Sequence, residues 1–150
     1  MGIKIQTIKE IRPFLKEELN GLFPEPEINA LSGIIIKTLF KLSTLHIHAY
    51  PETKVSIRQN NKIHKICKEL KTGKPIQYII GETDFYNCII MVSPEALIPR
   101  PETEEMVDLI IRENRGATGT IIDVGTGTGC IAISLAANIP GSQITATDFS

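Results

Sequence analysis

The last part of the sequence, residues 121–150, constrains the fold more than any other stretch. It starts with the run Ile-Ile-Asp-Val at 121–124, passes through Gly-Thr-Gly-Thr-Gly at 125–129, and continues as an alanine-rich segment to residue 137. A short β-branched run predicts a buried parallel strand, and the segment after the glycines has the composition of a helix. Glycine permits backbone conformations closed to other residues, so three alternating glycines predict a turn that a ligand can approach closely. The order strand, glycine turn, helix and second strand is typical of the first half of a nucleotide-binding α/β unit.

Acidic residues close both predicted strands. Asp123 stands near the end of the first, and Asp148 ends the second, over residues 143–148. An acid at the second position can accept hydrogen bonds from both hydroxyls of a ribose. The dinucleotide pattern G-x-G-x-x-G/A needs a small residue where Cys130 stands, which makes a nicotinamide-linked dehydrogenase the weakest alternative. No Gly-Lys-Ser/Thr occurs, so a P-loop is excluded. The pattern Asp-x-Gly-x-Gly-x-Gly resembles motif I of S-adenosylmethionine (SAM) methyltransferases; a purely structural glycine turn is the alternative.

Composition bounds the remaining possibilities. A chain of 150 residues fits one ordinary domain or two small ones. The net charge of -1 gives no general attraction to nucleic acid or to an anionic membrane. Three cysteines without C-x-x-C spacing predict reduced thiols, a cytoplasmic setting and no zinc site. We see no signal peptide and no apolar run long enough to cross a bilayer.

Helical periodicity dominates the first half of the chain. It predicts helices over residues 4–22, 27–42 and 54–72, with a short helix between the last two that Ser43 or Thr44 caps and Pro51 ends. Residues 1–75 are therefore expected to form a small helical bundle. The predicted inward positions are Ile5, Ile8, Ile11, Phe14 or Leu15, Leu19, Leu22, Ile28, Leu31, Ile35, Leu39, Leu42, Val55, Ile63, Ile66, Cys67 and Leu70.

The same region holds two groups of residues that could suggest other functions. His46 and His48 are two apart, which points them to different faces of a helix, and neither they nor His64 has a carboxylate or cysteine at ligand spacing. We expect no metal site. Five lysines within residues 62–74 lack interleaved aromatics, which indicates a solvated helix face; a contact surface for ribosomal RNA or an acidic partner is the alternative.

The helical periodicity ends after Pro75. Two apolar runs around a tight polar turn at residues 87–88 predict a β-hairpin. Two prolines around Arg100 then make a stiff extended segment, and Pro101 can open a helix that runs to about Asn114, with acids in its first turn.

Several of these segments together resemble the release-factor glutamine methyltransferases, the HemK/PrmC family. They are Ile-Pro-Arg-Pro-Glu-Thr-Glu at 98–104, Pro-Ile-Gln-Tyr-Ile-Ile-Gly at 75–81, Asp-Phe-Tyr at 84–86, and the loop 123–129. The resemblance is strong over residues 75–150 and extends to the helical part in pattern only. It implies an α/β fold with a helical release-factor-recognition domain (1–75), a β-hairpin linker (76–100) and the first part of a Rossmann-like SAM-dependent methyltransferase domain (101–150).

The resemblance also implies an activity. Members of the family transfer a methyl group from SAM to the side-chain amide nitrogen of the glutamine in the Gly-Gly-Gln motif of class 1 peptide chain release factors. Direct nucleic-acid or membrane binding is not expected. By the same resemblance, Asp123, Gly125, Thr126, Gly127, Thr128, Gly129 and Asp148 would bind the cofactor, and Phe85, Tyr86, Arg100, Pro101, Glu102 and Thr103 would wall the active-site mouth.

No catalytic residue can be named from this sequence. The Asn-Pro-Pro-Tyr motif that holds the acceptor amide in this family does not occur before residue 150. We therefore expect these residues to be the N-terminal portion of a longer enzyme. Alone, they should be inactive and bind SAM weakly or not at all. Two alternatives stay open: a SAM-dependent methyltransferase acting on another protein or on nucleic acid, and a release-factor-binding module without catalysis.

Overall fold

The computed structural model describes residues 4–42 and 44–149, without the side chains of Thr44, His46 and His48. The chain divides into two compact units, Met1–Ile80 and Gly81–Ser150. The division falls at residue 80, whereas the sequence placed the end of the helical domain at residue 75. Ser43, one of the two predicted caps of the short helix, lies outside the described residues.

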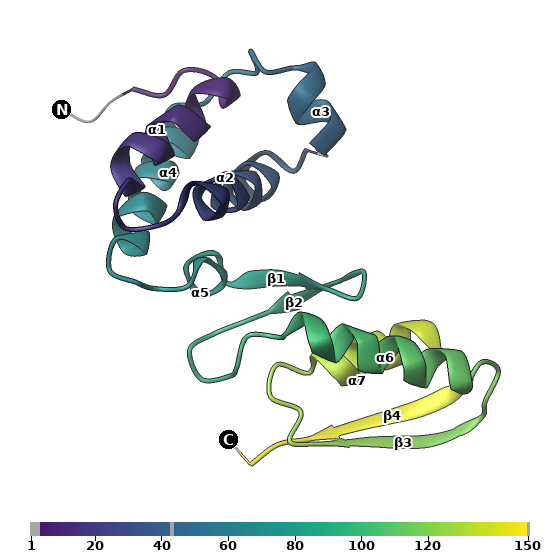
Figure 1. Ribbon diagram of the computed structural model, residues 1–150. Helices are drawn as coiled ribbons and strands as arrows, with labels where there is room; N and C mark the ends of the chain where they lie inside the picture. The colour runs from purple at the N-terminus through teal and green to yellow at the C-terminus, as the bar shows by residue number, and fades with distance from the viewer. Residues whose placement is uncertain (1–3, 43, 150) are drawn as a thin grey trace. The chain divides into compact units, whose positions relative to one another are not determined.

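The first unit is helical, as predicted (Figure 1). The helical segments predicted over residues 4–22 and 54–72 are shorter than their apolar patterns, whereas the helix predicted over 27–42 keeps its length and begins two residues earlier. In chain order the elements are the 3₁₀ turn η1 (Ile8–Glu10), α1 (Ile11–Leu19), α2 (Glu25–Phe40), α3 (Thr44–Ala49), α4 (Ile57–Leu70) and α5 (Ile76–Ile80).

A capping box fixes the start of α4. Ser56 Oγ accepts from the backbone N–H of Gln59 at 3.3 Å, and Gln59 Oε1 accepts from the backbone N–H of Ser56 at 2.9 Å. Each bond satisfies an amide that the first helical turn leaves without a partner. The helix therefore begins at Ile57, three residues after the predicted start, and Val55 lies outside it.

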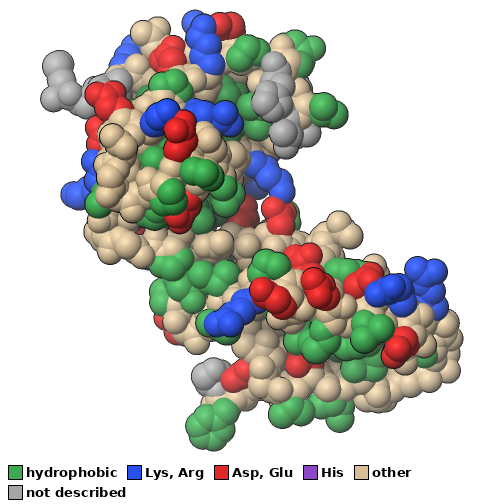
Figure 2. Space-filling model, viewed as in Figure 1, with side chains coloured by type: hydrophobic (Ala, Val, Ile, Leu, Met, Phe, Trp, Pro, Cys, Tyr) green, Lys and Arg blue, Asp and Glu red, His purple; other side chains and the backbone are tan. Residues whose placement is uncertain are grey.

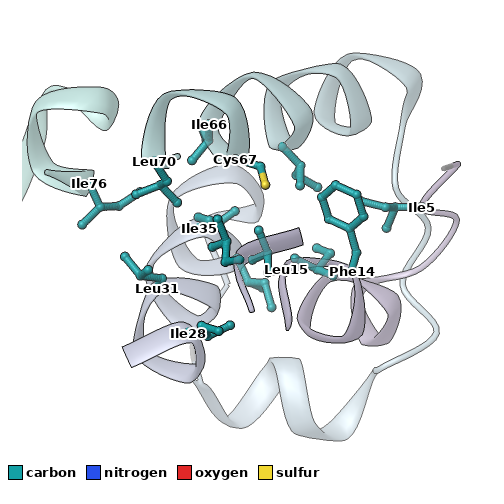
Figure 3. Close-up of a cluster of buried hydrophobic side chains, with 14 of the residues drawn as sticks. Ile5, Phe14, Leu15, Ile28, Leu31, Ile35, Ile66, Cys67, Leu70 and Ile76 are labelled. Carbon is teal, nitrogen blue, oxygen red and sulfur yellow. The ribbon is translucent and has the colours of Figure 1, made fainter. Parts of the chain in front are cut away.

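The core of the first unit joins α1, α2, α4 and α5 (Figure 3). Phe14 and Leu15 are both buried, where the periodicity had left a choice between them. The predicted inward position of Leu22 is wrong: it is 58% exposed, because it follows the end of α1 in a turn where Gly21 has a φ of +81°. The other buried side chains agree with the predicted helix faces; Leu39, Leu42 and Val55 pack against the core partly buried.

Residues 76–80 form a helix instead of leading directly into the hairpin. Ile79 N–H donates to the carbonyl of Pro75, and Ile76, only 5% exposed, belongs to the same core as Leu70. A five-residue apolar run has no period that distinguishes strand from helix, so burial against the end of α4 decides its conformation.

The second unit contains the predicted hairpin and the predicted strand–helix–strand unit. Strands β1 (Glu82–Phe85) and β2 (Cys88–Met91) are antiparallel, and β3 (Gly119–Val124) and β4 (Ser142–Thr147) are parallel. Helix α6 (Pro101–Glu113) precedes β3, and α7 (Cys130–Asn138) connects β3 to β4. The mixed α/β fold class is confirmed, and Pro101 stands at the first helical position as predicted.

Helix α7 is at the centre of this unit: it packs against α6, β2, β3 and β4. Its Leu135 and the neighbouring Ile139 are almost fully buried, as is Val107 of α6. The prediction of a fully buried first strand is wrong for the described residues. Ile122 is 62% and Val124 80% exposed, because one face of the β3–β4 pair lacks a cover within this unit. Figure 2 shows hydrophobic side chains on the molecular surface among the charged ones.

Candidate cofactor site

The glycine loop connects the end of β3 to the start of α7 (Figure 1). Gly125, Gly127 and Gly129 have φ angles of +76°, +54° and +76°. This left-handed region is one that side chains with a Cβ rarely adopt, so all three positions need glycine for backbone reasons. A Cβ placed on Gly125 or Gly127 would meet no atom within 4 Å. The loop therefore has an open face that a ligand can approach.

Backbone hydrogen bonds hold the loop against the end of β4. The amides of Gly125 and Thr126 both donate to the carbonyl oxygen of Thr147, at 2.8 and 3.0 Å. The amide of Gly129 donates to the carbonyl of Thr126 at 2.9 Å and closes the turn before α7. The loop conformation is therefore fixed by the strand pair itself.

The two predicted acids are both bonded to this loop. Asp123 Oδ2 accepts from the hydroxyl of Thr126 at 2.7 Å. Asp148 Oδ2 accepts from the backbone amide of Gly127 at 2.6 Å, and its Oδ1 accepts from the amide of Phe149 at 2.7 Å. The structure thus brings Asp123, residues 125–129 and Asp148 together at one end of the β3–β4 pair.

The bond between Asp148 and Gly127 was not predicted from the sequence. It gives the carboxylate a second function beside the expected ribose contact, because it holds the middle of the loop. A carboxylate oxygen has two lone pairs, so Asp148 can keep the amide of Gly127 and still accept from a hydroxyl group. The open loop face and this exposed acid match the chemistry of a nucleoside with an extended polar tail. The residues present fit SAM in this respect.

The residues predicted to wall the mouth occupy three different environments. Phe85 ends β1 and is 1% exposed, so its ring is buried. Tyr86 lies in the hairpin turn, and its hydroxyl donates to Asp108 Oδ1 of α6 at 2.9 Å. The segment 100–103 makes the N-cap and first turn of α6, where Arg100 is exposed. Their joint role at a mouth stays a prediction.

Asp108 is a residue that the sequence reading did not single out. Its second oxygen accepts from Arg112 Nη2 at 2.8 Å, one helical turn further along α6. The hydrogen bond to the Asp108 carboxylate raises the pKa of the Tyr86 phenol above its usual value. The spacing of Asp108 and Arg112 predicts an ion pair on a helix, but nothing in the sequence predicts its link to a hairpin turn.

A metal-binding cluster or a membrane-spanning helix would indicate another class of site. Within residues 4–42 and 44–149, histidine, cysteine, aspartate and glutamate side chains do not gather in groups of three or more that could hold a metal ion. The predicted absence of a site at His46 and His48 concerns side chains outside that description. None of the helices in the same part of the chain has the length and apolar character to cross a membrane.

Comparisons with known proteins point to one family. The family model described as "PrmC N-terminal domain" matches residues 6–81. The chain is 40% identical to the release factor glutamine methyltransferase of Flavobacterium psychrophilum, over 95% of this chain and 52% of that protein. It is 37% identical to the protein of that name from Bacteroides thetaiotaomicron, over 95% of this chain and 51% of that protein. It is 41% identical to the one from Streptococcus pneumoniae, over 83% of this chain and 44% of that protein. The chain spans about half the length of the curated relatives it matches.

Proposed function

This chain belongs to the PrmC family, whose N-terminal domain it carries over residues 6–81, and on that premise we propose that its protein methylates a peptide chain release factor. The methyl donor would be SAM, and the acceptor would be the side-chain amide nitrogen of the glutamine in the Gly-Gly-Gln motif of a class 1 factor. The observation that carries the proposal is the loop 125–129, with three left-handed glycines and two acids bonded to it.

Each residue of the loop has a distinct task in this proposal. Gly125 and Gly127 leave the open face against which the methionine part of the donor would lie, with Thr126, Thr128 and Gly129 completing the wall. Asp148 would accept hydrogen bonds from the ribose hydroxyls while it holds the amide of Gly127. Asp123 keeps the loop in place through the hydroxyl of Thr126.

The chemistry makes positioning the main demand on the protein. SAM supplies a methyl group on a sulfonium sulfur, which leaves as a neutral thioether. An amide nitrogen is a poor nucleophile because its lone pair is delocalised, so the protein must hold it in line with the breaking bond and hydrogen-bond the amide as charge develops. The first turn of α6, from Arg100 to Thr103, is proposed to form one wall of that space. We assign no acceptor-binding residue within residues 1–150.

The helical first unit would serve recognition of the release factor. A protein substrate needs contacts beyond one glutamine side chain, because a single small group gives little specificity. The first unit has its own core and can present such a surface independently of the loop. Since release factors act on the ribosome, we place the reaction in the cytoplasm.

The test uses the full gene product that carries residues 1–150, a class 1 release factor and isotope-labelled SAM. Mass spectrometry should find one methyl group on the Gly-Gly-Gln glutamine, and a release factor with that glutamine replaced should gain none. The Gly127→Ala variant should lose most activity. The matched Gly33→Ala variant changes an exposed glycine inside α2 with free space around it, and it should keep activity. Labelling of DNA or of another protein, with the release factor unmodified, would refute the proposal.

A further inference from the structure

The turn of the β-hairpin contains a residue that turn chemistry does not favour. Tyr86 and Asn87 are its two central residues, with φ angles of +42° and +61°. A two-residue turn with positive φ at both positions prefers Asn, Asp or Gly, because these residues tolerate the left-handed region. Asn87 meets that preference and Tyr86 does not. A bulky residue persists in this region when contacts of its side chain hold it there.

The side chain of Tyr86 makes such a contact. Its hydroxyl donates to Asp108 Oδ1 at 2.9 Å, and Asp108 Oδ2 accepts from Arg112 Nη2 at 2.8 Å. Both oxygens of the carboxylate are therefore used, one toward the hairpin and one along α6. The Asp108 carboxylate raises the pKa of the Tyr86 phenol, in agreement with the phenol donating the hydrogen bond in this contact.

These three side chains connect the hairpin to α6, and both the hairpin and α6 also pack against α7. Helix α7 follows the glycine loop and packs against both α6 and β2. Asp108 lies seven residues after Pro101, which is about 10 Å along the helix axis. A hydrogen bond at that point fixes α6 against the hairpin at some distance from its first turn.

We propose that Tyr86, Asp108 and Arg112 form a positioning latch, which fixes the hairpin on α6 and thereby sets the 100–103 segment relative to the glycine loop. In this arrangement Tyr86 acts through Asp108 as a positioning residue. The catalytic consequence rests on the proposed function. The latch itself rests only on the contacts within the second unit.

Kinetic measurements on the full gene product test whether the latch affects catalysis. Tyr86→Phe removes one hydroxyl and keeps the ring, and Asp108→Ala removes its acceptor. Tyr86→Phe should lower kcat for release-factor methylation about fivefold, the effect of one lost hydrogen bond, while KM for SAM stays within about twofold. Asp108→Ala also removes the ion pair with Arg112 and should lower kcat at least as much. The double variant should be no slower than Asp108→Ala alone, because both substitutions break the same hydrogen bond. Glu113→Gln, an exposed change at the end of α6, is the control and should match the parent protein.

A merely structural tyrosine gives a different result. In that case Tyr86→Phe lowers the unfolding temperature and leaves kcat unchanged well below that temperature, which would overturn the proposal. Loss of activity in the double variant equal to the product of the two single losses would overturn it as well.

A second measurement separates the latch from the proposed function. A double-mutant cycle on the unfolding free energy needs no substrate. Non-additive effects of Tyr86→Phe and Asp108→Ala support the latch, and additive effects overturn it. If the parent protein leaves the release factor unmodified, the proposed function fails, and this cycle still decides whether the latch exists.

Discussion

Replacement of Gly127 with alanine tests the backbone argument for the loop. Gly127 has a φ of +54°, and a Cβ there would meet no atom within 4 Å. The cost is therefore conformational and not steric. Alanine in the left-handed region is about 1–2 kcal/mol less favourable than in its preferred regions, and glycine has no such penalty. We expect Gly127→Ala to lower the free energy of unfolding by about 1 kcal/mol or to move the loop out of this conformation.

The matched substitution is Gly33→Ala. Gly33 lies within α2, is exposed, and also has free space where a Cβ would be. Alanine is about 0.5–1 kcal/mol better than glycine inside a helix, so this variant should be more stable than the parent. Urea unfolding followed by circular dichroism, with the unit that unfolds identified by hydrogen exchange, measures both changes. If both substitutions changed the free energy of unfolding in the same direction, the reasoning would be refuted. It depends on different backbone conformations at two sites that are equally open.

Three further predictions concern single side chains. Ser134→Ala should raise the unfolding free energy by about 1 kcal/mol, because this fully buried hydroxyl makes no hydrogen bond within the described residues; a loss on urea unfolding would mean that it has a partner. Ser56→Ala should cost about 1 kcal/mol and increase amide exchange in the first turn of α4, and unchanged exchange would contradict the capping box. Hydrogen bonds from the Gln6 amide and the Thr7 hydroxyl lower the pKa of Glu10 below 4.5. The contribution of these bonds to the free energy of unfolding is therefore present above that pH and is lost as the pH falls through the lowered pKa. Glu10→Gln should therefore reduce the acid dependence of stability in that range, and an unchanged pH profile would count against the assigned bonds.

Sequence reasoning succeeded where local chemistry determines the structure. The strand, glycine loop and helix over residues 119–138 follow from a β-branched run, three alternating glycines and an alanine-rich segment. The start of α6 follows from Pro101, whose fixed φ and missing N–H suit the first helical position. These features involve neighbours in the sequence, so composition and spacing contain the necessary information.

Prediction from the sequence failed where a contact between residues far apart in the sequence determines the structure. The run at 76–80 is helical because Ile76 packs into the core of the first unit, which no local period reveals. The bond from Gly127 to Asp148 spans 21 positions, and the bond from Tyr86 to Asp108 spans 22. Both depend on how elements pack, and sequence spacing alone does not pair such residues. Burial of β3 was overestimated for a related reason, since exposure depends on which elements cover a strand.

A titration of SAM tests the central claim most directly. Isothermal calorimetry on the full gene product should show one binding site, and Asp148→Asn should weaken SAM at least tenfold. Asparagine can still accept from the amide of Gly127 through its carbonyl oxygen, but it lacks the second oxygen, which accepts from the Phe149 amide. It also lacks the negative charge that strengthens hydrogen bonds from the ribose hydroxyls. Amide exchange of residues 125–129 should stay the same in the variant. Absence of SAM binding to the parent protein, or equal affinity in Asp148→Asn, would contradict the assignment of this loop as the cofactor site.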